Sequence, residues 1–511
     1  MKKLFKFLFS RLVLVGTLIL IQAVILAFLI WKLSSYFVYV YAFFMALSII
    51  MVLWIVNKQD KLSFKMPWVI LIMIVPVFGG LFYLLLGTSR ISAKHRKMME
   101  TLSKVTREQC KKIPSHIDEI YELDRYVASQ CTYIQNVTGM PVYKNTVGEY
   151  LSPGEKKFER LKAELEKATH YIFLEYFIIE EGVMWNSILE ILKNKAAQGL
   201  DVRIIYDDVG CLKTLPYKYD KHLQEFGIKC VVFNPFRPAL LTVLHNRDHR
   251  KIAIIDGHTC FTGGINLADE YINAYERFGH WKDASIVLTG EAVWSFTLMF
   301  LENWNFYQPI DSDFGKFKPS LYHTTSFVSD GYFQPYGDSP LDHEYVSESI
   351  YLNIINQATD YLYINTPYFI VGNELATAIT LAAKRGVDVR IVTPHVADKW
   401  YVHLVTQSFY KQLIEAGAKV YEYTPGFIHS KTFVSDDSLA SVGTVNLDYR
   451  SLCHHYECGT LIYKAKAVQE VKDDFLATLS LCAEITMEDC MKISCVKRLT
   501  RGVLNLFSPL M

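Results

Sequence analysis

The amino-acid sequence predicts an α/β protein in which two homologous domains form one site, preceded by N-terminal transmembrane helices. Three observations support this fold class. A pattern of His, any residue, Lys, four residues and Asp occurs twice, and the segments around both copies also repeat. Long apolar runs precede the repeat, and 51% of the 511 residues are hydrophobic. A chain of this length can bury the cores of two domains and still provide a membrane anchor.

The apolar runs before the repeat lie at residues 12–31, 36–56 and 68–86. Each is about as long as the ~30 Å hydrocarbon core of a bilayer at ~1.5 Å per residue. Basic residues cluster before the first run and on both sides of the third, and only Lys32 lies between the first two. If the third run, broken by Pro76, dips into the membrane without crossing it, every basic cluster stays cytoplasmic. We therefore predict a multi-pass protein of the cell membrane with cytoplasmic catalytic domains, and three full spans are the alternative.

Composition divides the chain into a membrane anchor, a charged helical linker or stalk, two α/β domains and a basic amphipathic tail. We place these parts at residues 1–88, 89–135, 136–320, 321–485 and 486–511. In the tail, basic residues such as Lys497 and Arg498 alternate with apolar ones, which suits a helix that lies on an anionic leaflet. An ordinary helix packed on the second domain is the alternative.

Apolar runs and helix-to-strand transitions recur in the same order around the two motifs. The run at residues 171–174 is matched by residues 361–364, and both suit a buried strand. Residues 196–204 return as 382–391, in each case a helix end, a glycine and a new strand. Two homologous halves follow, each with strands alternating with helices.

The first motif consists of His249, Lys251 and Asp256, and the second consists of His429, Lys431 and Asp436. In each copy His and Lys lie two residues apart, so on a strand both side chains project from the same face. Glycines and an asparagine close each copy, Asn266 in the first and Asn446 in the second. Because an amide can hydrogen-bond a phosphoryl oxygen of the substrate, we expect the His, Lys and Asn side chains of both halves to surround one anion.

These groups suit phosphoryl transfer without a metal or another cofactor. With an ordinary pKa near ~6.5, one imidazole attacks phosphorus in its neutral form while the other, protonated, donates a proton to the leaving alkoxide. Lysine charges stabilise the developing oxyanions. Asp283 and Glu457 are the candidates for holding the second ring nitrogen of each histidine.

Asp256 and Asp436 allow two interpretations. Each completes a motif that carries catalytic groups, which favours a direct role in catalysis. Each is also followed by a residue that suits a turn, Gly257 or Asp437, and aspartate commonly begins a turn between strands. We count both among the predicted catalytic residues and leave the two roles open.

The cysteines are scattered and form no C-x-x-C pair, which predicts reduced thiols and argues against a disulfide framework. His454 and His455 lie between Cys453 and Cys458, a composition that also occurs in metal sites. No second cluster completes a tetrahedral set of ligands. We therefore predict a structural role for these residues and no bound metal.

The sequence resembles the phospholipase D superfamily, and within it the bacterial cardiolipin synthases. The resemblance is carried by "HRKIAIIDGHTCFTGGIN" and "HSKTFVSDDSLASVGTVNLDYRS" around the motifs and by the apolar stretch at residues 67–87. It implies two phospholipase D-like domains and a phosphatidyltransferase that needs no metal. One phosphatidylglycerol donates its phosphatidyl group to an enzyme histidine, and a second accepts it, releasing glycerol. The resemblance also implies that His249 is the nucleophile and His429 the general acid.

The charge balance of the chain indicates which molecules it binds. Lys and Arg number 53 and Asp and Glu number 52, so the chain lacks the basic excess expected of a nuclease, and we predict no nucleic-acid partner. Phosphatidylglycerol and anionic membrane lipid are the expected partners, with Arg247 and Arg250 as candidate ligands of lipid phosphate.

A membrane-bound hydrolase that uses water as the acceptor is the alternative function, because no sequence motif shows whether water is excluded from the site. The oligomeric state stays open.

Overall fold

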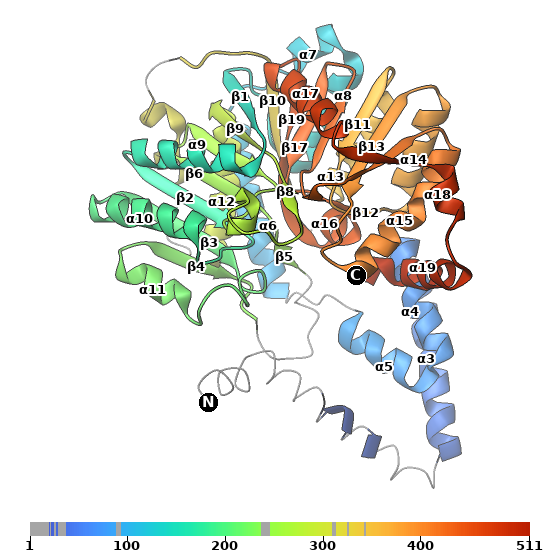
Figure 1. Cartoon of the computed structure of the whole chain (residues 1–511). Coiled ribbons are helices and arrows are strands. Elements are labelled where there is room, and N and C mark those ends of the chain that lie inside the picture. Colours follow the sequence, from blue (N-terminus) through green and yellow to red (C-terminus); the bar gives the residue numbers. More distant parts are fainter. Residues whose placement is uncertain are drawn as a thin grey trace. The chain divides into compact units, whose positions relative to one another are not determined.

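The computed structural model describes residues 20, 22–24, 27–28, 37–87, 93–236, 246–308, 313–323, 326–341 and 344–510. The chain separates into two units (Figure 1). One contains helices α3 to α5, and the other contains the later helices and the β-sheets. Most of the predicted apolar run at 12–31 lies outside the described residues, so its span stays a prediction.

The N-terminal unit consists of α3 (Phe37–Asn57), α4 (Leu62–Ile74) and α5 (Pro76–Leu86). Proline lacks a backbone N–H and fits the first turn of a helix, so Pro76 begins α5 and separates it from α4. The helices share a small core of Met51, Ile55, Ile72 and Tyr83. Within the described part of the chain, no helix combines the length and the apolar character needed to cross a membrane.

The first α/β domain is built on a mixed sheet with strand order β1-β9-β7-β6-β2-β3-β4. Strands β2, β3 and β4 pair in parallel, and the remaining neighbours are antiparallel. The strands are β1 (Thr146–Leu151), β2 (Tyr171–Tyr176), β3 (Asp201–Asp207), β4 (Lys229–Phe233), β6 (Lys251–Ile255), β7 (Thr259–Gly263) and β9 (Ser285–Gly290). The main helices are α9 (Gly154–Lys167), α10 (Val183–Ala197), α11 (Tyr219–Glu225) and α12 (Val293–Tyr307).

The second domain repeats this plan in the order β10-β19-β17-β16-β11-β13-β14-β20. Strands β11, β13 and β14 are parallel, as their counterparts β2, β3 and β4 are. The strands are β10 (Tyr332–Asp338), β11 (Tyr361–Asn365), β13 (Asp388–Pro394), β14 (Lys419–Tyr423), β16 (Thr432–Ser435), β17 (Leu439–Gly443), β19 (His455–Tyr463) and β20 (Cys482–Ile485). The main helices are α13 (Val346–Gln357), α14 (Asn373–Lys384), α15 (Trp400–Glu415) and α17 (Lys466–Leu479). The prediction of two homologous α/β halves is confirmed.

The two sheets share an apolar layer. Side chains alternate across a strand, so Ile172 and Leu174 of β2 face α9 and α10, whereas Phe173 faces α12. In the second domain, Tyr363 of β11 points into the same central layer, where it stacks on Phe475 of α17. Helices therefore cover both faces of each sheet, which explains why β2 and β11 are buried along their whole length.

Short strands cross between the domains. β5 (Arg247–Asp248) of the first domain pairs with the start of β19, so that His455 lies opposite Arg247. β8 (His280–Lys282) of the first domain pairs with β15 (Gly426–Ile428) of the second. Each motif histidine directly follows one of these strands, so the crossing strands position both histidines at the domain boundary.

The segment predicted as a linker or stalk is folded against the domains. It forms α6 (Ala93–Cys110), α7 (Ile117–Leu123) and α8 (Arg125–Thr138). Ile134 of α8 is buried in the core of the second domain, and Met99 of α6 lies in the layer between the sheets. This packing differs from a free-standing stalk, because the apolar stripes of α6 and α8 are wide enough to be buried.

The predicted C-terminal tail contains α18 (Met487–Met491) and α19 (Cys495–Phe507). Arg501 of α19 is buried and donates a hydrogen bond to Gln407 of α15. Val496, Leu499 and Val503 are exposed on α19. Helix α19 therefore packs on the second domain and also keeps an apolar face in solvent.

Candidate active site

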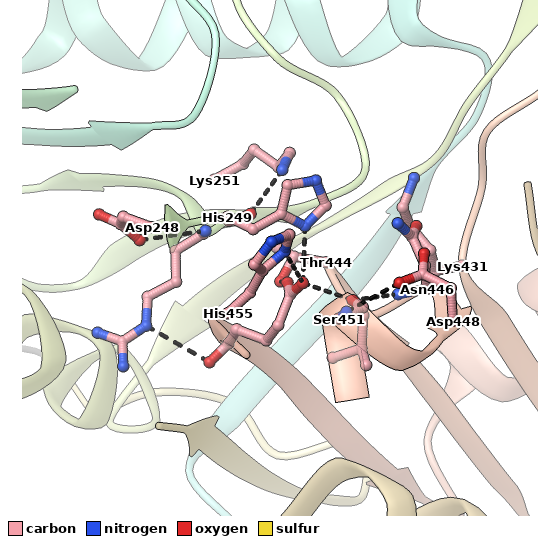
Figure 2. Close-up of polar contacts among 12 residues, drawn as sticks. Asp248, His249, Lys251, Lys431, Thr444, Asn446, Asp448, Ser451 and His455 are labelled. Carbon is pink, nitrogen blue, oxygen red and sulfur yellow. Dashed lines mark hydrogen bonds and ion pairs between the residues drawn. The ribbon is translucent and has the colours of Figure 1, made fainter. Parts of the chain in front are cut away.

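His249 and Glu457 form a pair that joins the two domains. The backbone N–H of His249 donates to the carbonyl of Tyr456, as an extension of the β5–β19 pairing. This register brings the His249 ring to the second domain, where Nδ1 lies 2.8 Å from Oε1 of Glu457 (Figure 2). Glu457 is buried and also accepts hydrogen bonds from the hydroxyls of Ser451 and Thr444.

His429 and Asp283 form the reciprocal pair. The backbone N–H of His429 donates to the carbonyl of Lys282, at the end of the β8–β15 pairing. Nδ1 of His429 lies 2.6 Å from Oδ2 of Asp283, and Oδ1 of Asp283 accepts from the backbone N–H of Ala284. Each histidine therefore takes its carboxylate from the other domain, and neither domain contains a complete pair.

The glycine after β7 makes room for this arrangement. A Cβ atom on Gly264 would lie 2.0 Å from Oδ1 of Asp283, far inside van der Waals contact. Only hydrogen in place of a side chain lets the backbone pass so close to the carboxylate. The glycine of the first motif thus leaves the room that Asp283 needs in order to reach the ring of His429.

The motif lysines are buried next to their histidines. Nζ of Lys251 donates to the backbone carbonyl of His249, and Nζ of Lys431 donates to the carbonyl of His429. Burial lowers the pKa of Lys251 to about 8 and that of Lys431 to about 7. The charge on these lysines is therefore poorly solvated, and an anion in the site would stabilise it.

Burial also lowers the pKa of both histidines. The pKa of His249 falls to about 3, mainly through desolvation, with Lys251 acting in the same direction and Glu457 opposing it. The pKa of His429 falls to about 4, again mainly through desolvation and with a contribution from Lys431. For Glu457, burial alone would raise the pKa, but His249 and Lys251 outweigh it and hold this pKa well below its ordinary value. At neutral pH both imidazoles are therefore neutral, and His249 is hydrogen-bonded to the ionised carboxylate of Glu457.

The comparisons with known proteins match both halves of this site. A family model described as cardiolipin synthase, PLD-like domain matches residues 161–279 and 351–479, one stretch in each domain. A second model, described as phospholipase D-nuclease N-terminal, matches residues 46–87. A cardiolipin synthase of Halalkalibacterium halodurans is 32% identical over 465 residues, which cover 87% of this chain and 88% of the relative. The chain belongs to the cardiolipin synthase family.

Other similar proteins also match most of the chain. Cardiolipin synthase 1 of Bacillus cereus is 30% identical and the match covers 95% of this chain and 97% of the relative. An uncharacterized protein of Streptococcus mutans is 43% identical over 90% of this chain and 99% of its own length. Among solved structures, a phosphatidylserine synthase of Haemophilus influenzae has the same fold, with a TM-score of 0.56, 15% identity and coverage of 74% of this chain and 96% of that one. The resemblance seen in the sequence is confirmed.

The family motif aspartates, Asp256 and Asp436, lie away from this site. Each follows the far end of a motif strand, roughly 16 Å from the lysine at ~3.3 Å per residue. The carboxylate of Asp256 accepts hydrogen bonds from the backbone N–H groups of Thr169, His170 and Tyr171. Asp436 makes the equivalent bonds to residues 359–361. These bonds favour the turn-forming interpretation, because the carboxylate oxygens hold the turns before β2 and β11, and a direct role of either aspartate in catalysis stays a prediction.

The side chains of Asn266 and Asn446 differ in which hydrogen-bonding atoms have no partner among the described residues. Asn266 accepts from the backbone N–H of Ile178 and donates to the hydroxyl of Tyr271, so one amide hydrogen remains. Asn446 is also buried, and its side-chain oxygen has no hydrogen-bond partner among the described residues. A phosphoryl oxygen accepts hydrogen bonds, so only a side-chain N–H of these asparagines could bind it, and a role for either amide in substrate binding stays a prediction.

Arg250, predicted as a ligand of lipid phosphate, makes contacts with other residues of the protein. Its guanidinium donates to the backbone carbonyl of Glu457 at 3.4 Å and lies 3.7 Å from a carboxylate oxygen of Glu175. Arg247 pairs with the buried carboxylate of Asp207 at 3.3 Å. In these contacts the charge of each arginine compensates a buried carboxylate. Nε and Nη2 of Arg247 have no hydrogen-bond partner among the described residues, so binding of lipid phosphate by the arginines stays a prediction.

Sequence reasoning missed the hydroxyls of Ser451 and Thr444 that support Glu457. Ser451 lies five residues after Asn446, and the residue at the same distance after Asn266 is Tyr271. The two positions carry different residue types, so the repeat gives no sign of a shared role. His455, expected to be structural, lies beside the His249 ring with 5.5 Å between the ring centroids (Figure 2).

Proposed function

We propose that the protein is a membrane-associated cardiolipin synthase, which converts two phosphatidylglycerol molecules into cardiolipin and glycerol. The observation that carries the proposal is the reciprocal pair of His–carboxylate contacts, His249 with Glu457 and His429 with Asp283. Because each carboxylate holds Nδ1, the Nε2 atom of each ring is left for chemistry on one phosphate between the domains. Membership of the cardiolipin synthase family supports the choice of lipid substrate.

In the first half-reaction, Nε2 of His249 attacks the phosphorus of phosphatidylglycerol. A P–N bond forms, the P–O bond to the glycerol headgroup breaks, and His429 donates a proton to the departing oxygen. The free enzyme holds His429 neutral, with a pKa of about 4. The negative charge of the bound phosphate raises this pKa, so that binding of the substrate supplies the protonated acid.

In the second half-reaction, a hydroxyl of another phosphatidylglycerol attacks the phosphatidyl-histidine. Neutral His429 takes the hydroxyl proton, the P–N bond breaks, and cardiolipin leaves His249 free. Lys251 and Lys431 stabilise the charge on the phosphoryl oxygens in both steps. The hydroxyl donors on Glu457 fix the carboxylate that orients His249, which supports this histidine as the nucleophile.

The lipid must be reached from the membrane surface, and three features support that access. The segment at residues 46–87 matches a family N-terminal model, and α3 exposes apolar side chains such as Val38, Phe43 and Ile50. The basic clusters around the apolar runs favour a multi-pass anchor with the catalytic domains in the cytoplasm. The exposed apolar face of α19, flanked by Lys497 and Arg498, suits an anionic leaflet.

The test uses full-length protein purified in detergent, supplied with phosphatidylglycerol alone and with EDTA present. Cardiolipin and glycerol in equal amounts are the expected products. Phosphatidic acid and glycerol without cardiolipin would replace the proposal by a phospholipase D-type hydrolase, in which water is the acceptor. A reaction that requires added divalent metal would overturn the metal-independent mechanism.

A further inference from the structure

His455 brings a third imidazole into contact with the His249–Glu457 pair. One ring nitrogen of His249, one ring nitrogen of His455 and one carboxylate oxygen of Glu457 lie within 4.8 Å of one another. The three side chains come from both domains, because β5 pairs with the start of β19. This cluster shares His249 and Glu457 with the groups that we assign to phosphoryl transfer and adds His455, which has no part in that chemistry.

The ring nitrogens of His455 are shielded from solvent, although the residue as a whole is only partly buried. Its side chain is 11% exposed, and among the described residues neither ring nitrogen has a partner. Its Nδ1 lies 3.7 Å from Oε1 of Glu457, which is too long for a hydrogen bond. An unsatisfied buried polar group typically costs about 1–3 kcal/mol, so a ligand that binds the ring would recover free energy that the protein alone does not.

The chemistry of the cluster selects the class of ligand. Two imidazole nitrogens and one carboxylate oxygen form a donor set found in zinc sites that keep an open coordination position. Mg²⁺ and Ca²⁺ prefer oxygen ligands throughout. Lys251 donates to the backbone carbonyl of His249, and its charge repels any cation, so only an ion that forms strong bonds to imidazole would bind here.

We propose that His249, His455 and Glu457 form an inhibitory site for Zn²⁺. Bonds of about 2.0–2.2 Å would place the ligand atoms roughly 3.5 Å apart, so the widest separation in the cluster must shorten by about 1 Å through side-chain rotation. Ser451 and Thr444 hold the carboxylate of Glu457 in place and act as the supporting layer.

The ion takes the place of the hydrogen between Nδ1 of His249 and Glu457. That hydrogen moves to Nε2, which is the atom that attacks phosphorus in the proposed function. Because a protonated Nε2 has no lone pair to donate, the metal-bound enzyme cannot form the phosphatidyl-histidine. Binding of the ion is independent of the proposed function, whereas inhibition rests on it.

Co²⁺ is the probe for binding, because Zn²⁺ has a filled d shell and gives no visible absorption. Full-length protein in detergent, freed of metal with EDTA and exchanged into metal-free buffer, is titrated with Co²⁺. We expect a visible d–d band that saturates near one equivalent and disappears when Zn²⁺ is added. His455→Asn removes one of the three ligands and should weaken Co²⁺ binding by at least about 100-fold, because loss of a residue that only supports a ligand already costs 10–100-fold.

His454→Asn is the matched control, because His454 is the neighbouring histidine and is not part of the cluster. It should bind Co²⁺ as the unaltered protein does. Absence of a d–d band in the unaltered protein overturns the site, and this measurement does not depend on any variant folding. An unchanged affinity in both His455→Asn and His455→Gln, with thermal melting as a check on folding, also overturns it.

Inhibition is measured as the ratio of phosphatidylglycerol turnover with and without Zn²⁺ for each protein. We expect Zn²⁺ to lower turnover at least 10-fold in the unaltered protein, with recovery on adding EDTA, and to leave the ratio near one in His455→Asn. Unchanged turnover at saturating Zn²⁺ overturns the inhibitory role. Loss of cardiolipin synthesis in metal-free buffer instead contradicts the proposed function, and the Co²⁺ titration then decides the site alone.

Discussion

At the scale of single residues, the site depends on four side chains held in two crossed pairs. Glu457 and Asp283 fix the tautomer of His249 and His429, and burial keeps both rings neutral until a phosphate arrives. The same anion also stabilises the charged form of Lys251 and Lys431, because burial destabilises that form in the free enzyme. Substrate binding and protonation of the site are therefore coupled.

His249→Ala and His429→Ala should each lower turnover by roughly 10³-fold, because general acid–base catalysis alone contributes ~10²–10⁴-fold. The double variant should be little worse than the more impaired single variant, because the two groups act as a unit. A substrate with a nitrophenol leaving group needs no proton, so it should rescue His429→Ala far more than His249→Ala. Rescue of His249→Ala alone would exchange the roles of nucleophile and acid.

The alkaline limb of kcat/KM should lie near pH 7 to 8. The pKa of Lys431 is lowered to about 7 and that of Lys251 to about 8, so both lose their charge in the free enzyme as pH rises through this range. In the complex, the phosphate raises both pKa values, so the limb of kcat should lie at higher pH. Initial rates across a pH series test this, and a kcat/KM that stays constant up to pH 9 contradicts it.

Asp256→Ala should affect stability and leave the chemistry intact. The change frees the backbone N–H groups of Thr169, His170 and Tyr171. Of these residues only Tyr171 is buried, and an unsatisfied buried donor typically costs about 1–3 kcal/mol. We expect a lower thermal midpoint and a kcat within about 3-fold of the unaltered enzyme, normalised to the folded fraction. A loss of kcat comparable to that of His249→Ala would instead support a direct role of Asp256 in catalysis.

At the scale of elements, two short inter-domain pairings determine the geometry of the site. β5 pairs with β19 over two residues, and β8 pairs with β15 over three. The longer strands were readable from the sequence as apolar runs that recur in both halves, and so was the choice of Asp283 and Glu457 as partners of the histidines. Strands of this length have no periodicity, so the crossed pairing could not be predicted.

Substitution of Gly264 tests how closely the backbone after β7 must approach Asp283, which lies in the loop before β9. Gly264→Ala places a Cβ atom 2.0 Å from Oδ1 of Asp283, so the carboxylate must move away from His429. We expect kcat to fall at least 10-fold, since misplacement by about 1 Å can cost 10²-fold. Gly502→Ala, in α19 with no atom within 4 Å of the new Cβ, is the control and should keep full activity.

At the scale of the whole molecule, the catalytic domains are expected on the cytoplasmic side of the membrane. Cys495 is exposed, whereas Cys131, Cys230 and Cys260 are buried, so α19 carries a natural reporter thiol. A membrane-impermeant thiol reagent should leave Cys495 unlabelled in intact cells and label it after permeabilisation. Labelling in intact cells that Cys495→Ser abolishes would put the domains outside and favour three spans.

The crossed pairs also govern when activity can first appear during protein synthesis. His429 lies 146 residues after Asp283, and Glu457 lies 208 residues after His249. A nascent chain that has emerged only as far as the first domain therefore carries an imidazole without the carboxylate that orients it. We therefore expect a chain truncated before residue 457 to be inactive, because His249 then lacks the carboxylate that orients it. The active site is complete only after the second half of the polypeptide has been synthesised.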